Sequence, residues 1–370
     1  MKKKYSEKIR LDALARKKAR EDEQVLHDKI VSGEVAVFEP CRLDKFLAER
    51  NTKISRSTFQ KLITTNRVEV NGKHETDLDY LVRESDEVHF FMPHIVTFAR
   101  EIKDFESEVI FENHNVVVVN KPAGILTHSK GELNDEFTVA DFAKAKIIQA
   151  TRANDQDALD DDDTSFLKTK SNRPGIVHRL DRATSGVLIV AKNAAAARLL
   201  QRQLQDRKAH KTYLAIVDWA PKLDHARLDL PIGRNPKAPS TFRVDPSGKS
   251  ALTEYETLAH FADGGGLIEL RPTTGRTHQL RVHLRYINAP IAGDAIYNEK
   301  FTKKYVKMDE AKRVKSRLFL HAAKLEITIP ADDGTNVRRI FRAPLPDDFI
   351  QGIKRRDPKF DFSTLNEKLD

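Results

Sequence analysis

Apolar residues recur at helical spacing in two successive short stretches near the start of the chain. In RLDKFLAER (residues 42–50) and SRSTFQKLI (55–63), apolar positions lie three or four residues apart, so each stretch predicts a helix with one buried face. Ser55 opens the second stretch as a candidate N-cap. The following RVEVNGK contains Asn71-Gly72, a pair that favours a tight hairpin turn. This part of the chain therefore predicts two helices and a β-hairpin.

Longer apolar runs further along the chain predict both strands and helices. Asn193 precedes AAAARLLQRQLQDRK as a candidate N-cap of a strong helix. HQLRVHLRYI places Leu280, Leu284 and Ile287 on one face of another helix. Buried strands are predicted at 116–119, 186–192, 211–217 and 267–271. Because strands and helices mix without a regular β-α-β rhythm, the predicted class is α+β rather than a doubly wound sheet.

Three segments are too polar to belong to a packed core. Residues 1–40 form a charged N-terminal extension, and the dense run of charged side chains at 1–34 predicts a solvated helix or mobile arm with little fixed structure. Residues 151–172 include DQDALDDDDT, which predicts a solvated acidic insertion. Residues 351–370 predict a charged tail. Between these segments we expect a small domain at 41–100 and a larger domain at 105–350.

The composition and net charge of the chain indicate which class of molecule it binds. The chain of 370 residues carries 64 Lys and Arg against 55 Asp and Glu, a net charge of +9, which favours a polyanion such as nucleic acid. Its mean hydropathy is −0.54, and no run approaches the length of a membrane-spanning helix. The opening MKKKYSEK leads into more charge instead of an apolar signal, so we expect a cytoplasmic protein. The single cysteine, Cys41, excludes an internal disulfide.

Basic residues gather on the two predicted helices and the hairpin that follows them. Charge alone is equally compatible with a solvated helical hairpin. The order RLDKFLAE, SRS, QKLI and RVEVNGK, however, closely resembles the alpha-L (S4-type) RNA-binding motif from about Cys41 to Met92. The resemblance implies that the exposed basic side chains of this module contact RNA. We assign this role to Arg42, Lys45, Arg56, Lys61 and Arg67.

Four short motifs stand at the ends of predicted strands: NKPAG, HRLDRATSG, KTYLA and GRTHQLR. Taken singly, their residues have ordinary structural interpretations. Asp181 suits a turn, Tyr213 a half-buried strand and Arg276 a surface. His178, His278 and His283 lack the paired spacing with Cys, Glu or further His that a metal site shows, so we expect hydrogen-bonding or packing roles and no metal.

In this order and spacing, the four motifs closely resemble the RluA-type pseudouridine synthases, from about Val109 to Asp348, with PIAGDAIY extending the likeness. The resemblance implies a mixed, largely antiparallel sheet and an isomerase that detaches a uracil base, turns it and rejoins it through carbon 5. Asp181 would be the catalytic carboxylate, which can attack the sugar or remove a proton from it. Arg276 would keep that carboxylate charged and aimed.

The resemblance also implies roles for other residues of these motifs. Tyr213 would stack on the extruded uracil and assist proton removal at carbon 5. Arg179 would fill the gap that the base leaves in the RNA, and Leu280 would form an apolar floor for the base. Lys121 of NKPAG is assigned to RNA binding. Arg182 remains a phosphate contact or a bystander.

The predicted function is therefore RNA pseudouridine synthesis without a cofactor, by a monomer with RNA as its partner and no membrane. Large-subunit ribosomal RNA is the first candidate substrate and transfer RNA the second, because the alpha-L module accompanies mainly the ribosomal members of the family. One alternative is a non-catalytic RNA-binding or ribosome-assembly protein on the same fold. Another is a metal-dependent nuclease that uses the Asp cluster at 160–163.

Overall fold

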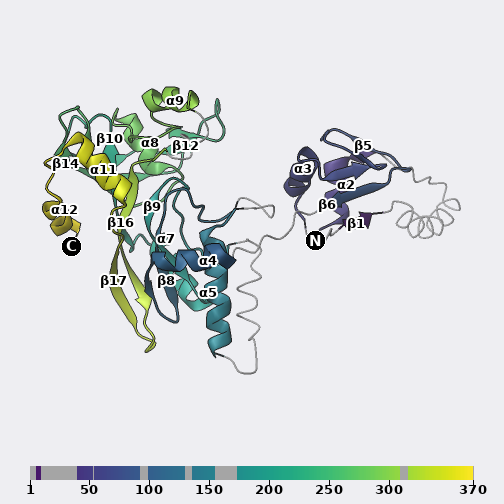
Figure 1. Ribbon diagram of the computed structural model, residues 1–370, viewed down its shortest axis with the longest axis horizontal. Coiled ribbons are helices and arrows are strands. Elements are labelled where there is room, and N and C mark those ends of the chain that lie inside the picture. The colour runs from purple at the N-terminus through teal and green to yellow at the C-terminus, as the bar shows by residue number, and fades with distance from the viewer. Residues whose placement is uncertain are drawn as a thin grey trace. The chain divides into compact units, whose positions relative to one another are not determined.

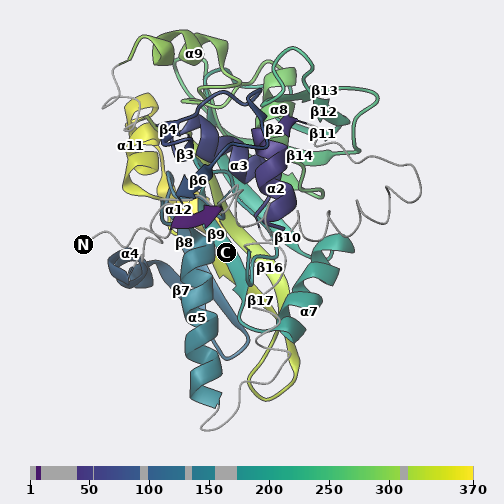
Figure 2. The ribbon, with the colours of Figure 1, turned by 90° about the vertical axis from the view of Figure 1, so that its right-hand side faces the viewer.

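The computed structural model describes residues 6–9, 40–52, 54–91, 99–129, 136–154, 173–308 and 316–369. The chain divides into two compact units, the first ending at Thr97 and the second beginning at Phe98. Figures 1 and 2 show the elements of each unit. No helix in these described ranges is both long and apolar enough to cross a membrane.

The first unit packs two helices against a small antiparallel sheet. Apolar side chains of both helices, including Phe46 and Phe59, are fully buried with Phe90 of the sheet. Ser55 caps the second helix by accepting a hydrogen bond from the backbone of Thr58. The elements are β1 (Ser6–Ile9), β2 (Cys41–Arg42), α2 (Leu43–Arg50), α3 (Arg56–Thr64), β3 (Val68–Val70), β4 (Lys73–His74), β5 (Leu81–Val82) and β6 (Val88–Phe91).

The hairpin between β3 and β4 turns at Asn71-Gly72, as its sequence predicts. Asn71 has φ 52° and Gly72 has φ 75°, the left-handed conformations that a tight hairpin turn requires. One prediction for the first 40 residues is wrong in part, because β1 pairs antiparallel with β6. Residues 1–5 and 10–39, where little fixed structure is predicted, lie outside the described residues.

The second unit is built on a nine-stranded sheet in the order β11-β14-β15-β10-β16-β9-β8-β7, with β17 paired to β16. All of these pairings are antiparallel except that of β16 with β9, so the predicted α+β class with a largely antiparallel sheet is confirmed. The strands of this sheet are β7 (Val109–Glu112), β8 (Val116–Lys121), β9 (Ser185–Ala191), β10 (His210–Val217), β11 (His225–Asp229), β14 (Leu252–His260), β15 (Gly266–Pro272), β16 (Leu320–Pro330) and β17 (Asn336–Arg342). A separate two-stranded sheet pairs β12 (Ile232–Arg234) with β13 (Phe242–Val244).

Helices cover both faces of this sheet (Figures 1 and 2). Because successive side chains of a strand point to opposite faces, Val117 and Val119 of β8 pack with α5, whereas Val116 and Val118 pack with α7. The other helices follow the same division, α8 packing on the α5 face and α11 on the opposite one. The helices are α4 (Ala99–Phe105), η1 (Glu106–Glu108), α5 (Val139–Asn154), α7 (Ala194–Gln205), α8 (Gln279–Tyr286), α9 (Glu299–Val306), α11 (Asp347–Arg356) and α12 (Phe362–Leu369).

Two segments predicted to lie outside the packed core, the C-terminal tail and the acidic insertion, contribute residues to helices. Residues 351–369, predicted as a charged tail, complete α11 and form α12, and Ile353 and Leu365 are buried in the core of the second unit. Amphipathic spacing within a charged segment explains the error, because few apolar residues suffice to dock a helix. Of the predicted acidic insertion, residues 151–154 complete α5, and 155–172 lie outside the described residues.

Candidate active site

Three of the four motifs meet in one cleft, which residues of α7 and α8 also line. HRLDRATSG leads into β9, KTYLA lies within β10 and GRTHQLR leads into α8. The cleft measures about 480 Å³, a volume typical of sites for small organic groups. Its lining includes five of the residues singled out in the sequence: Arg179, Asp181, Tyr213, Arg276 and Leu280.

The turn that carries Asp181 is fixed by the NKPAG segment beside it. Gly124 donates from its backbone to the carbonyl of Arg182 at 2.7 Å, and Nε of Arg182 donates back to the Gly124 carbonyl at 3.0 Å. The hydroxyl of Thr127 donates to the carbonyl of Leu180 at 2.8 Å. Asp181 is therefore flanked on both sides by anchored residues. Arg182, which also pairs with Glu136, belongs to this anchoring.

Lys121 is a structural residue of the same segment, and its assignment to RNA binding is wrong. The side chain is fully buried, and Nζ donates to the carbonyls of Pro122 and Ile125 at 2.8 Å each and of Arg182 at 3.3 Å. Burial, and then repulsion from Arg317, lowers the pKa of Lys121 to about 7. Because a strand end can turn its side chain inward or outward, the motif alone did not reveal this burial.

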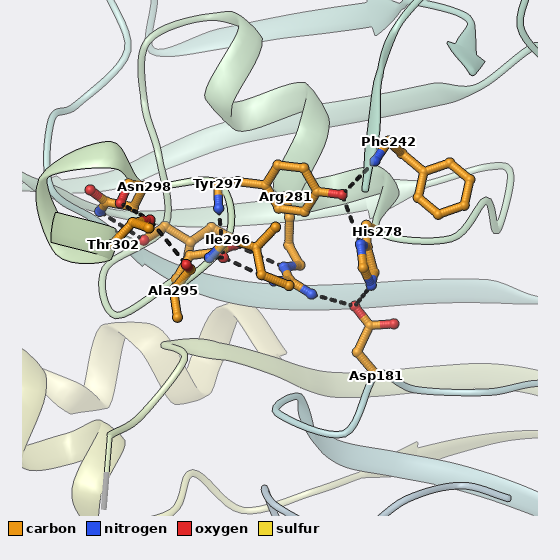
Figure 3. Close-up of polar contacts among 11 residues, drawn as sticks. Asp181, Phe242, His278, Arg281, Ala295, Ile296, Tyr297, Asn298 and Thr302 are labelled. Carbon is orange, nitrogen blue, oxygen red and sulfur yellow. Dashed lines mark hydrogen bonds and ion pairs between the residues drawn. The ribbon is translucent and has the colours of Figure 1, made fainter. Parts of the chain in front are cut away.

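Asp181 forms its ion pair with Arg281, not with Arg276. Nη1 of Arg281 donates to Oδ2 of Asp181 at 3.1 Å (Figure 3). Arg276 is exposed, and its Nε donates to the carbonyl of Ser250 at 2.9 Å. The predicted role of Arg276 as partner of Asp181 is therefore wrong, although Arg276 does line the cleft. The cause is its position: Arg276 precedes α8 in the turn, whereas Arg281 lies on the buried side of the helix.

Asp294 holds Arg281 in place from behind. Nε and Nη2 of Arg281 donate to its two carboxylate oxygens at 2.8 and 2.9 Å, a bidentate geometry that fixes the guanidinium plane. One of these oxygens also accepts from the backbones of Ile296 and Tyr297. Burial disfavours the charge of Arg281, but Asp294 and then Asp181 outweigh it, so its pKa is raised. The Asp181 carboxylate thus faces a permanently charged, rigid partner.

His278 is a second neighbour of Asp181, and the structure defines its hydrogen bonds. Tyr297 places its hydroxyl 2.8 Å from Nδ1 of His278, and this hydroxyl accepts from the backbone of Phe242 at 2.9 Å. Because a hydroxyl has one proton and two lone pairs, it can donate to Nδ1 of the neutral ring or accept from Nδ1–H. Nε2 of His278 lies 3.7 Å from Oδ2 of Asp181 (Figure 3). Burial lowers the pKa of His278, which favours the neutral ring.

Tyr213 and Leu280 form the apolar part of the cleft and are both buried. Burial, and then the charge of Asp181, raises the pKa of the Tyr213 phenol, so the free protein keeps it protonated. A neutral ring suits stacking on a base. Arg179 is exposed at the same cleft, where a side chain can reach a bound nucleic acid.

Sequence reasoning missed Arg281, Asp294 and the pair His278 and Tyr297. A signal for each was present, since GRTHQLR contains His278 and Arg281 and PIAGDAIY contains Asp294 and Tyr297. The motifs did not reveal which of these residues contact one another. His178 and His283, also weighed as metal ligands, have hydrogen-bonding roles: His178 accepts from the backbone of Ile189, and His283 contacts Thr253 and the Leu230 carbonyl.

Two of the five basic residues that we assign to RNA binding, Arg42 and Arg56, form ion pairs within the first unit. Arg56 donates to the buried carboxylate of Asp44 at 2.9 and 3.1 Å, and Arg42 contacts the same carboxylate at 3.3 Å. Despite the cost of burial, the hydrogen bonds of Arg56, Gln60 and Arg42 lower the pKa of Asp44 to about 2. Lys45 lies 3.7 Å from Glu49. Of the five residues assigned to RNA binding, Arg42 is half-buried, and Lys45, Arg56, Lys61 and Arg67 are exposed. Their RNA-binding role stays a prediction.

Comparison with known proteins agrees with the fold and the cleft. Residues 115–286 match the family described as RNA pseudouridylate synthase, and residues 41–88 match the S4 domain. The chain is 32% identical over 314 residues to an uncharacterized RNA pseudouridine synthase of Bacillus subtilis, covering 85% of this chain and 93% of that one. It is 33% identical over 324 residues to ribosomal large subunit pseudouridine synthase D of Borreliella burgdorferi, covering 87% of each.

A solved structure shows the same architecture. The human RNA pseudouridylate synthase domain containing 4 aligns with a TM-score of 0.50 and 25% identity, over 69% of this chain and 95% of that one. Fold, cleft and relatives together define an RNA-modifying isomerase. The chain belongs to the RNA pseudouridine synthase family, and it joins the catalytic domain to an N-terminal S4 domain. The resemblance to the RluA-type enzymes is thereby confirmed.

Proposed function

We propose that this enzyme converts uridines of large-subunit ribosomal RNA to pseudouridine with Asp181 as its catalytic carboxylate. The observation that carries the proposal is the arrangement of Asp181, which faces the cleft from an anchored turn and is held by Arg281. The Borreliella burgdorferi relative, named for the large ribosomal subunit, supports the choice of RNA. Transfer RNA is the second candidate.

The chemistry breaks the bond between nitrogen 1 of the base and the ribose, and joins carbon 5 of the turned base to the same ribose carbon. Nitrogen 1 gains a proton and carbon 5 loses one, so no cofactor is consumed. Asp181 either attacks the sugar or removes a proton from it, and both roles require a carboxylate at a fixed position. Arg281 and Asp294 supply that fixed position without moving during the reaction.

The remaining cleft residues hold the base. Tyr213 stacks on the extruded uracil, and Leu280 lies beneath it as an apolar floor. Arg179, exposed at the rim, enters the gap in the RNA and offsets part of the cost of unstacking, which amounts to a few kcal/mol. The raised pKa of Tyr213 favours stacking over proton removal by this residue. We further propose a monomer that acts in the cytoplasm, consistent with its single cysteine.

Asp181→Asn tests the proposal, because the amide keeps the shape of the carboxylate and loses its charge. Tritium release from ribosomal RNA labelled at carbon 5 of uridine should be abolished, while RNA affinity stays within a few-fold. Near-normal release by the variant would refute the assignment of Asp181. Mapping pseudouridines in RNA from cells with and without the protein identifies the substrate. A modification lost from transfer RNA alone would reverse the order of candidates.

Two alternatives make different predictions in the same assays. A non-catalytic assembly protein would release no tritium even as wild type. The nuclease alternative relies on residues 160–163, which lie outside the described residues. Isomerisation in excess chelator separates it from our proposal, since a metal-dependent nuclease would stop.

A further inference from the structure

A second concave surface is lined by the C-terminal end of α8, whereas the catalytic cleft is lined by the N-terminal end of the same helix. We call it the Trp219 groove, and its lining includes Trp219, Lys222, Leu223, Arg285, Lys300 and Lys303. It measures about 1060 Å³, about twice the catalytic cleft. Its walls come from the segment after β10, from α8 and from α9, which is joined to α8 by the ion pair of Arg285 with Glu299 at 2.6 Å. None of its residues has a role in the mechanism above except Tyr297.

Tyr297 and α8 connect the groove with the catalytic cleft. The Tyr297 side chain lines the groove, while its hydroxyl contacts His278 beside Asp181. Arg281 lines the cleft and Arg285 lines the groove. These two residues are four apart on one helix, a rise of about 6 Å. One helix therefore contributes residues to both the catalytic cleft and the groove.

The groove exposes large apolar side chains. Trp219 is 43% exposed and Leu223 is 64% exposed. Both stand in the segment that follows β10, within the second unit. An exposed tryptophan beside an exposed leucine in a concave surface is typical of a binding site rather than of solvated surface. The flat indole is a platform on which a planar group can stack.

The positive charge of the groove indicates which kind of planar group stacks on Trp219. The lining carries four basic residues and one acidic one, Glu299, which is already paired with Arg285. Nζ of Lys300 lies 5.4 Å from the centre of the Trp219 ring, and Lys303 is exposed on the same helix. Aromatic platforms flanked by cations bind single-stranded nucleic acid, because bases stack and phosphates pair with the cations. An acidic peptide would satisfy the cations but leave the indole uncovered.

We propose that the Trp219 groove binds a single-stranded segment of the RNA substrate, with one base stacked on Trp219 and neighbouring phosphates held by Lys300 and Lys303. The inference rests on the action of this family on RNA. It does not depend on which RNA is modified or on the role of Asp181. The function of the groove is to hold the part of the RNA that adjoins the segment entering the catalytic cleft.

Trp219 is the only tryptophan of the chain, so its fluorescence reports on this groove alone. We would titrate the full-length Asp181→Asn protein, in which the proposed catalytic carboxylate is replaced, with a uridine-rich single-stranded oligonucleotide. Binding should quench the indole emission and protect it from acrylamide. The variant Lys300→Ala with Lys303→Ala should weaken the quenching titration on the order of tenfold, the equivalent of about 1.4 kcal/mol. The matched control changes Lys354 and Arg355, exposed on α11, to Ala and should leave the titration unchanged.

A substrate assay in the otherwise wild-type enzyme complements this titration. Trp219→Ala should raise KM several-fold and leave kcat unchanged, and Trp219→Phe should restore part of the affinity. The inference is overturned if saturating RNA, followed by anisotropy of a labelled oligonucleotide, leaves the emission and acrylamide quenching unchanged. It is also overturned if polyglutamate quenches as well as RNA does, or if the α11 control weakens the titration equally. Each of these results is independent of whether Asp181 proves catalytic.

Discussion

Nη1 of Arg281 donates to Oδ2 of Asp181 at 3.1 Å, although 100 residues separate the two. The pair joins the turn before β9 to the first turn of α8, and Asp294 holds it from the buried side. Because the Arg281 side chain is buried and that of Asp181 is only 18% exposed, each charge depends on the neighbouring groups for compensation. The cleft therefore contains a preorganised carboxylate rather than a flexible one, and several measurable consequences follow from its surroundings.

Arg281 and Arg276 should differ sharply when each is replaced by Ala. Arg281→Ala leaves the buried Asp294 carboxylate without its cation, so the free energy of unfolding should fall by about 3–5 kcal/mol and isomerisation should be lost. Arg281→Lys should keep the fold better but remain slow, because an ammonium cannot make the bidentate contact. Arg276→Ala should keep its rate at saturating RNA. Urea unfolding and single-turnover rates measure these effects, and a slower single turnover for Arg276→Ala than for Arg281→Lys would contradict them.

His278 should act as a positioning residue for Asp181. His278→Ala should lower kcat about tenfold without changing KM, because the polar contact of Nε2 with the Asp181 carboxylate at 3.7 Å is lost, and tenfold corresponds to about 1.4 kcal/mol. Tyr297→Phe should have a smaller effect in the same direction, because Nδ1 loses its partner. Phe242→Leu keeps the backbone donor to Tyr297 and should be nearly normal. Equal kcat values for His278→Ala and wild type would exclude the role.

Lys121 should make stability depend on pH in the alkaline range. Its pKa is lowered from 10.5 to about 7 in the folded protein, so between these values the unfolded chain binds a proton that the folded chain does not. The free energy of unfolding therefore rises with pH across this window. In Lys121→Met this contribution is absent, so the wild type should gain stability relative to the variant from about pH 7 to pH 10. Urea denaturation at a series of pH values measures the difference, and a flat or falling difference would contradict the assignment.

Lys61 and Arg67, both exposed on the first unit, should contribute to RNA affinity and not to chemistry. Changing both to Glu should raise KM and leave kcat at saturating RNA unchanged. The dependence of log affinity on log salt should flatten by roughly 1 to 2, because two phosphate contacts are lost. Lys354→Glu with Arg355→Glu, both exposed on α11, controls for total charge and should alter neither quantity to the same extent. A fall in kcat with an unchanged salt slope would mean that the S4 domain shapes the active site instead.

The sequence by itself determined the local elements and the family. The two helices and the hairpin of the first unit follow from apolar spacing, from Ser55 as a cap and from Asn71-Gly72 in left-handed conformations. Asn193 likewise caps α7 by accepting from the Ala196 backbone. Such features depend on residues a few positions apart, so short stretches of sequence contain all the information they require. The order and spacing of the four motifs were also sufficient to identify the family, through their resemblance to the RluA-type pseudouridine synthases.

Only the tertiary structure decided which of these residues touch. Asp181 pairs with Arg281 rather than Arg276 because α8 turns Arg281 toward the sheet, and the rotation of a helix about its axis is set by packing with strands distant in sequence. Lys121 is buried because the NKPAG turn folds back on the Arg182 carbonyl, 61 residues away. The left-handed Gly186 of HRLDRATSG has φ 116°, and a Cβ there would meet the Ala322 carbonyl oxygen of β16 at 2.2 Å. These contacts join segments whose proximity is a property of the strand order, which no local pattern in the chain specifies.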